Sequence, residues 1–413
     1  MTHSISYLAF SFLFFTNGAE LASWNQWRGP DRTGIIAENS FPASIHENHL
    51  KLSWKTPLDP SYSGPVVSNE LVFTTETLKK EEEVVHAFSR KDGKKVWSTK
   101  WKGSMTVPFF AASNGSWIRA TPAFDGEFLY VAGMRDVLVC INAKTGEIKW
   151  KLDFVEKLKT PLPAFGFVSS PLLDDNFVYV QAGAAVCKID KKTGEILWRS
   201  MTDGGGMWGS AFSSPFMANL HGKKLLLVQS REKLAAIVPE NGEVMWSKTV
   251  PSFRGMNILT PTVINNSIFT STYQNKSWLF QINKSDSGFE VQESWSNKLP
   301  GYMSSPVIIG GHAYLHLQNQ RFACIDLANG ETKWTSQKSF GKYWSMIASG
   351  TRILALDQNG TLHLIDANPK ELKILESRKI TENESWAHIA FDNNQIIIRD
   401  LKSLMVFEWK KTP

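Results

Sequence analysis

The chain has 413 residues, 16 of them tryptophan, and a formal net charge of +6. Its length leaves room for two or three small domains or for one large repeat fold. No run of about 18 consecutive apolar residues occurs beyond residue 20, so no membrane-spanning helix is expected in the mature chain. Lysine and arginine are scattered and mostly follow turns, which favours a solvated basic surface over a nucleic-acid site.

The first 23 residues have the pattern of a secretory signal peptide. Residues 7–15 are a short apolar run, and small and polar residues follow it up to residue 23. No lysine or arginine precedes the run, so an uncleaved anchor is the alternative. We expect residues 1–23 to be a signal peptide, residues 24–49 an N-terminal extension and residues 50–413 one domain. The protein is then periplasmic or secreted.

One pattern recurs along the chain: a turn that ends in glycine, then three residues, then tryptophan. Five copies end at Trp97, Trp150, Trp198, Trp246 and Trp334, and degenerate copies lie at residues 287–295 and 366–369. Glycine supplies the positive φ that a tight hairpin demands. A large flat indole fills the wedge between neighbouring sheets and has an N–H to donate. We therefore interpret the five tryptophans as structural docking residues rather than catalytic ones.

A second mark, two small residues followed by proline, opens each unit. Six copies end at Pro65, Pro122, Pro171, Pro215, Pro261 and Pro306, and weaker copies without proline lie at residues 344–346 and 386–388. The eight starts are 40 to 57 residues apart, with room for four short strands in each unit. Self-similarity at this period predicts a β-propeller.

The two ends of the repeat region complement each other. Residues 50–58 read as a lone strand with a tryptophan, Trp54, at the outer-strand position. The last unit has only three strands, at residues 388–391, 395–399 and 404–408. We predict an all-β fold, an eight-bladed β-propeller of four-stranded blades, in which the N-terminal strand completes the last blade.

The repeats carry a resemblance to a known family. Residues 142–150 and 190–198 have the form of the tryptophan-docking repeat of pyrroloquinoline-quinone (PQQ) type propellers, and residues 24–34, WNQWRGPDRTG, are similar to the start of many secreted bacterial members. The resemblance covers nearly the whole mature chain. It implies the fold, whereas the superfamily includes both dehydrogenases and an outer-membrane assembly scaffold. The chain is similar to the scaffold branch.

The residues offer little support for the dehydrogenase chemistry that the resemblance also implies. Those enzymes bind PQQ in the central funnel beneath a disulfide of adjacent cysteines, with Ca²⁺ and a catalytic aspartate. Here Cys140, Cys187 and Cys324 are far apart, and Cys140 and Cys324 fall in a small third-strand position where other repeats have alanine. No histidine or acidic cluster has metal-ligand spacing. We predict no catalytic residue, metal or cofactor; a PQQ-dependent oxidoreductase is the alternative.

Strand alternation places the blade-to-blade connections and the second-to-third loops on one face, here called the long-loop face. Its longest loops are at residues 75–83, 102–116, 153–167 and 201–211. Aromatic and polar residues cluster near the starts of the inner strands on this face: Trp117, Arg119, Trp208, Arg254, Tyr302, Trp344, Trp386 and His388.

We expect these eight residues to bind a protein or a cell-envelope polymer, in a monomer that binds no nucleic acid. Arg119 and Arg254 would suit a carboxylate or phosphate. The alternative is that the aromatic rings only pack the loops against the propeller. The glycine-rich residues 204–209 are either part of this face or a flexible approach to an inner strand.

Overall fold

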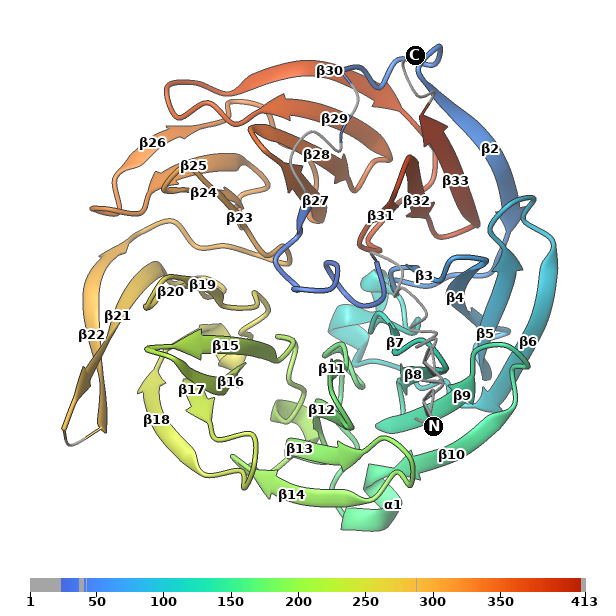
Figure 1. Cartoon of the computed structure of the whole chain (residues 1–413), viewed down its shortest axis with the longest axis horizontal. Helices are drawn as coiled ribbons and strands as arrows, with labels where there is room; N and C mark the ends of the chain where they lie inside the picture. The colour runs from blue at the N-terminus through green and yellow to red at the C-terminus, as the bar shows by residue number, and fades with distance from the viewer. Residues whose placement is uncertain (1–23, 37–40, 42, 287, 410–413) are drawn as a thin grey trace, which may run out of the picture.

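The computed structural model describes residues 24–36, 41, 43–286 and 288–409. Eight sheets stand in a ring around a central shaft, and the chain runs around the ring from blue to red in Figure 1. Helical structure in the described residues is limited to α1 (Phe154–Leu158) and the 3-10 turns η1 (Phe109–Asn114), η2 (Gly206–Trp208) and η3 (Phe253–Gly255). The prediction of an all-β, eight-bladed propeller is confirmed.

Each blade has four strands, numbered here from the shaft outward along the chain. Blades 1 to 4 contain β3 (Val66–Val67), β4 (Leu71–Leu78), β5 (Glu82–Ser89), β6 (Lys95–Lys102); β7 (Ala123–Phe124), β8 (Phe128–Gly133), β9 (Val137–Asn142), β10 (Ile148–Asp153); β11 (Leu172–Asp174), β12 (Phe177–Ala182), β13 (Ala185–Asp190), β14 (Ile196–Ser200); and β15 (Phe216–Leu220), β16 (Lys223–Gln229), β17 (Lys233–Ile237), β18 (Val244–Thr249).

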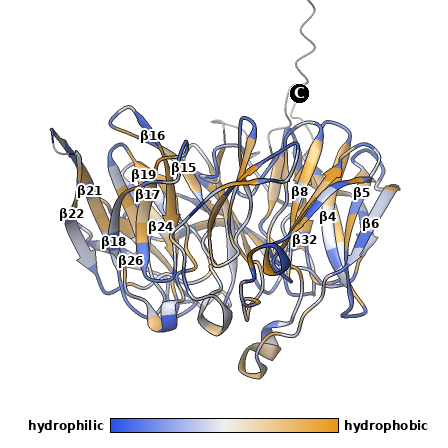
Figure 2. Ribbon diagram, turned by 90° about the horizontal axis from the view of Figure 1, so that it is seen from below, coloured by the Kyte–Doolittle hydropathy of each residue, from blue (hydrophilic) through white to orange (hydrophobic). Residues whose placement is uncertain are grey.

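Blades 5 to 8 follow the same plan. They contain β19 (Thr262–Ile264), β20 (Ser267–Ser271), β21 (Ser277–Ser285), β22 (Gly288–Asn297); β23 (Val307–Ile309), β24 (His312–His316), β25 (Phe322–Asp326), β26 (Thr332–Thr335); β27 (Trp344–Ser349), β28 (Arg352–Asp357), β29 (Thr361–Asp366), β30 (Lys373–Lys379); and β31 (Ala390–Asp392), β32 (Gln395–Arg399), β33 (Ser403–Trp409) with β2 (Leu50–Pro57). From the side, apolar strands alternate with polar turns at the edges (Figure 2).

The last blade takes its outer strand from the N-terminal part of the chain, as predicted. β2 pairs antiparallel with β33, from Leu50 opposite Trp409 to Pro57 opposite Ser403. A further short strand, β1 (Ile35–Ile36), adds to the inner strand of blade 7 in parallel orientation. The pairing of β2 leaves no open edge between the first and last blades.

A bulge recurs at one register position of every blade, between the third and the outer strand. The outer-strand residue beside it is tryptophan in seven blades and Glu376 in blade 7: Trp54, Trp97, Trp150, Trp198, Trp246, Trp295, Trp334 and Glu376. Cys140 and Cys324 lie opposite two of these tryptophans, where blades 1 and 4 have alanine.

Six of these indole groups donate to a backbone carbonyl of the next blade, at 2.8 to 3.0 Å. Trp150, for example, donates to the carbonyl of Lys191 at 2.9 Å and packs over Gly194. Trp246 is buried, but its indole nitrogen has no partner in the described structure. The hairpin of the following blade is longer there, because β21 and β22 continue to Ser285 and Gly288.

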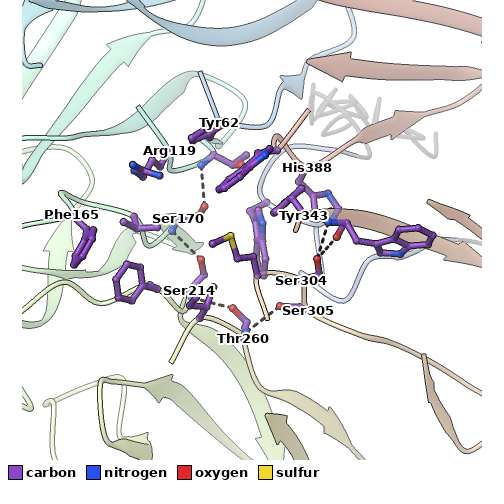
Figure 3. Close-up of a pocket in the computed structure, with 18 of the residues that line it drawn as sticks. Tyr62, Arg119, Phe165, Ser170, Ser214, Thr260, Ser304, Ser305, Tyr343 and His388 are labelled. Atoms are coloured by element: carbon purple, nitrogen blue, oxygen red, sulfur yellow. Dashed lines mark hydrogen bonds between the residues drawn. The ribbon is translucent and has the colours of Figure 1, made fainter. Parts of the chain in front are cut away.

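A ladder of hydroxyl groups joins the inner strands around the shaft. In blades 1 to 5 the backbone amide just before the inner-strand proline donates to the hydroxyl at the same position of the next blade, at 2.9 to 3.0 Å: Gly64 to Thr121, Thr121 to Ser170, Ser170 to Ser214, Ser214 to Thr260, and Thr260 to Ser305. Figure 3 shows part of this ladder. The second small residue of the repeated mark therefore has a structural reason beyond its size.

Residues 24–36 cross the centre of the ring, where Figure 1 shows them in blue. Asn25 exchanges hydrogen bonds with Phe124, the last residue of β7, and the amide of Val67 donates to the carbonyl of Trp24. The guanidinium of Arg28 donates to the carbonyl of Pro306 on the other side of the shaft. The segment thus spans the shaft near the ends of the inner strands and closes it on the side opposite the long-loop face. No helix of the described residues is long and apolar enough to cross a membrane.

Candidate functional site

A pocket of about 180 Å³ lies in the shaft and opens toward the long-loop face. Its wall includes the hydroxyl-bearing residues Thr121, Ser170, Ser214, Thr260 and Ser305, which stand just before the inner strands of blades 2 to 6. Figure 3 shows these groups on one side, with Tyr343 and His388 on another. Because every blade contributes its inner strand to the shaft, this is the place where residues far apart in sequence converge.

Trp27 of the N-terminal segment forms the floor of this pocket. The guanidinium carbons of Arg28 and Arg32 lie 5.5 and 5.4 Å from the centroid of its ring. Arg32 also donates to the carbonyls of Pro171 and Ser170, so the segment is fixed to blade 3 as well as to blade 6. Two arginines from a non-repeating segment therefore place positive charge directly behind the floor.

An aromatic wall, formed by Tyr62, Trp386 and Tyr343, borders the pocket. Tyr62 and Trp386 stack with ring centroids 4.7 Å apart, and Trp386 and Tyr343 are parallel within 7° at 6.1 Å. The guanidinium of Arg119 lies 5.4 Å from the centroid of Tyr62 and donates to the carbonyl of Gly115 at 2.7 Å. A flat apolar surface thus ends at a fixed cation.

The pocket is electropositive. Burial lowers the pKa of Arg28 and Arg32 to about 9 and that of Arg119 to about 10, so all three stay charged at neutral pH. Among the described residues, no carboxylate lines the pocket or forms an ion pair with these arginines. His388 is neutral at that pH, because burial and the nearby Arg28 lower its pKa to about 3.

The eight predicted ligand-face residues do not form one cluster. Arg119, Trp344, Trp386 and His388 line the pocket, whereas Trp117, Arg254 and Tyr302 do not. Trp208 ends the turn η2, and its side chain lies outside the part of the chain that the structure describes. Whether any of the eight binds a ligand stays a prediction.

Two of the four pocket residues are less available than the sequence implies. The ring of Trp344 is parallel to the rings of His316 and His363, at 5.8 and 5.5 Å, and is only 1% exposed. His388 is buried against Trp24 and Trp27, and its Nδ1 lies 2.9 Å from the carbonyl of Ile389. Packing is therefore the main role of these two side chains, as in the alternative raised above.

Sequence reasoning did not place Trp27 and Tyr62 in the site. Trp27 belongs to the segment WNQWRGPDRTG, whose position over the shaft no repeat pattern could show. Tyr62 stands directly before the first small-small-proline mark, at the same place as the aromatic residues considered in later blades. Its position relative to that mark was the signal available.

An apolar rim lies on the blade-to-blade connections of the same face and consists of Phe109, Phe110, Met207 and Phe253. Their residues are 91%, 53%, 45% and 44% exposed, and they belong to η1, η2 and η3. Phe110 also contacts Phe165 at the pocket, with ring centroids 6.1 Å apart. The side view in Figure 2 shows a loop that projects well below the blades. Large apolar side chains on projecting turns of one face are typical of a protein-binding surface.

The residues of the shaft do not fit PQQ held by Ca²⁺. In the described residues no group of three or more His, Cys, Asp or Glu side chains is placed to hold a metal ion. Calcium requires carboxylate and carbonyl oxygens, and no carboxylate lines the pocket. The three cysteines are buried and unpaired on the third strands of blades 2, 3 and 6, and burial raises the pKa of each thiol to about 11 or 12.

The family model of the outer membrane protein assembly factor BamB matches residues 80–336. The BamB protein of Yersinia pestis is 19% identical over 261 residues, which are 61% of this chain and 61% of that protein, so less than two thirds of its length is matched. BamB of Moranella endobia (strain PCIT) is 21% identical over 346 residues, covering 81% of this chain and 82% of that protein.

Solved structures share the fold. The crystal structure of BamB from Moraxella catarrhalis superposes with a TM-score of 0.65 at 13% identity, over 87% of this chain and 100% of that one. The computationally designed Ika8 protein gives 0.58 at 9% identity, over 85% and 98%. Since the family match covers more than half of the chain, the resemblance to the scaffold branch of PQQ-like propellers is confirmed: the chain belongs to the family of the outer membrane protein assembly factor BamB.

Proposed function

We propose that this protein is a non-catalytic scaffold of the periplasm that binds polypeptides during the assembly of outer membrane proteins, through its long-loop face. The relatives in its family are named as assembly factors for outer membrane proteins. The signal-like pattern of residues 1–23, which lie outside the described residues, supports export.

The apolar rim is the observation that carries this proposal. Phe109, Phe110, Met207 and Phe253 lie on three connections of one face, beside the mouth of the shaft pocket. A large apolar side chain exposed on a surface turn gains stability only when a partner covers it. The other exposed large apolar residues, such as Val96 and Leu52, are isolated on strands rather than grouped on turns.

A polypeptide suits this rim better than a charged envelope polymer. Phenylalanine and methionine side chains match the apolar side chains of an unfolded or partly folded protein, whereas a polyanion requires rows of exposed lysine or arginine. Arg254, the exposed arginine beside Phe253, is the single cation within the three turns that carry the rim. Protein binding is therefore the favoured function, and polymer binding is one outcome of the test.

The test measures binding of a urea-denatured outer membrane β-barrel polypeptide, labelled with a fluorophore and diluted into the purified protein. We expect Phe109→Ser with Phe110→Ser to weaken binding by about ten-fold or more, the equivalent of ~1.4 kcal/mol. Val96→Ser is the matched control, because Val96 is equally exposed but lies on β6 of the same blade. Equal affinity of the double variant and the wild type, or binding of an anionic polysaccharide alone, would contradict the proposal.

A further inference from the structure

We propose that the shaft pocket binds a small aromatic carboxylate, with its ring on the aromatic wall of Tyr62, Trp386 and Tyr343 and its carboxylate toward Arg119. This site is distinct from the apolar rim, since none of the four rim residues lines the pocket. Its ligand is a compact molecule or chain end rather than an extended polypeptide surface. The proposal therefore goes beyond the scaffold function.

The charge of the pocket selects for an anion. Arg119 is the one charged side chain among the described lining residues, and Arg28 and Arg32 stand behind the Trp27 floor. The printed partners of the three guanidinium groups are carbonyls and one amide oxygen rather than carboxylates. The carboxylate of Glu384, which acts on Tyr62 electrostatically, belongs to an exposed residue. An anion in the pocket would supply the negative charge that these cations lack.

Two buried donors beside the pocket have no acceptor. The Nε of Arg119 and the indole nitrogen of Trp386 make no hydrogen bond in the described structure, although both residues line the pocket. A buried donor without a partner costs about 1–3 kcal/mol, so such groups are rare where they have no ligand. Their place at the two sides of Tyr62 locates the anionic end of the ligand.

The shape and size of the pocket select for one or two rings. The rings of Tyr62, Trp386 and Tyr343 present one flat side, and Phe165 and Phe212, with centroids 5.6 Å apart, lie on another. A cavity of roughly 150 Å³ accommodates benzene. The 180 Å³ here suits a single ring with a short acidic arm better than a tricyclic quinone. The hydroxyls of Ser170, Ser214 and Thr260 are already used between blades, so they leave the wall mainly apolar.

The test is calorimetric titration of the whole purified protein with three probes. These are 3-phenylpropanoate, its neutral analogue 3-phenylpropanamide, and N-acetylphenylalanine, which adds the amide of a polypeptide end. We expect the acid to bind at least about ten-fold more tightly than the amide. Tighter binding of N-acetylphenylalanine than of 3-phenylpropanoate would identify a chain end as the source of the ligand, and weaker binding a free acid.

Variants separate the pocket from non-specific attraction. We expect Arg119→Met to abolish the preference for acid over amide and Arg119→Lys, which keeps the charge, to retain most of it. Arg321→Met is the matched control, because Arg321 is exposed in a loop of the same face but does not line the pocket. Melting curves establish that each variant is folded. The proposal is overturned if wild-type protein binds acid and amide equally, if it binds neither at millimolar concentration, or if folded Arg119→Met binds the acid as well as the wild type.

Discussion

The carboxylate of Glu376 accepts a hydrogen bond from the amide of Ile45 at 2.8 Å. It occupies in blade 7 the position at which the other blades have tryptophan. The next blade has no hairpin between its third and outer strands, because β33 and β2 come from opposite ends of the propeller. An indole at this position would have no turn to pack on, whereas a carboxylate can bind the segment that leads into β2. The same oxygen also accepts from the hydroxyl of Ser44.

Replacement of Glu376 should therefore loosen the closure of the ring. We expect Glu376→Ala to lower the free energy of unfolding by about 1–3 kcal/mol, because the buried amide of Ile45 loses its acceptor. Urea denaturation followed by circular dichroism measures the change. Glu371→Ala is the control, as Glu371 is exposed shortly before β30. A loss of the same size in both variants would contradict the assigned role.

The docking tryptophans should contribute to stability one blade at a time. We expect Trp150→Ala to cost roughly 3–5 kcal/mol, because it removes the packing on Gly194 and the bond to Lys191. Gly194→Ala should also destabilise, since its Cβ would lie 2.8 Å from the Trp150 ring at a residue with φ of 74°. Thermal melting measures both. Unchanged stability of Trp150→Ala would disprove a role between blades.

Two buried carboxylates should make stability depend on pH. Glu83 accepts from the amide of Met134, and Asp136 accepts from the amide of Gly183. Burial raises the pKa of each to about 7. The folded state therefore holds protons that the unfolded state has released, and the stability from these groups is complete below about pH 4 and is lost as pH rises toward 7.

Asp136→Asn keeps an acceptor oxygen and removes this titration. We expect the difference in urea midpoint between pH 5 and pH 8 to shift, relative to wild type, toward greater stability at pH 8. His316 and His388, whose pKa values burial lowers to about 4 and 3, act in the opposite direction but are present in both proteins. An identical pH profile of variant and wild type would show that Asp136 does not titrate in this range.

The chemistry of the shaft predicts no quinoprotein activity. No carboxylate lines the pocket within the described residues, so Ca²⁺ has no anionic ligand there. We expect the absorbance spectrum of added PQQ to be independent of Ca²⁺ in the presence of the protein, and no dye-linked oxidation of ethanol. Calcium-dependent uptake of PQQ with alcohol oxidation would support the oxidoreductase alternative instead.

The sequence predicts the ring well because every blade repeats the same local chemistry. The turn glycine, the tryptophan four residues later and the small residue before proline each recur, so the strand order and the closure by β2 follow from counting units. The position of Cys140 opposite Trp150 follows from the same spacing. Repetition supplies eight independent readings of one structure.

The pocket is less predictable because its distinctive residues lie outside the repeat. Trp27 reaches the shaft through a segment that has no counterpart in any blade, and its position depends on long-range bonds such as that of Arg28 to Pro306. Likewise, Trp344 reads as a candidate ligand residue until its contacts with His316 and His363 are known. Sequence patterns locate the inner-strand starts but not the direction of each side chain.

Site-specific photocrosslinking from the apolar rim tests the scaffold function most directly. A photoreactive phenylalanine analogue replaces Phe109, which is 91% exposed, or Val96 as the control on β6, in cells that make outer membrane proteins. We predict that the Phe109 position yields covalent adducts with an outer membrane β-barrel polypeptide or a protein of its assembly machinery, and that the Val96 position does not. Adducts of equal yield from both positions, or none from Phe109, would contradict binding through the long-loop face.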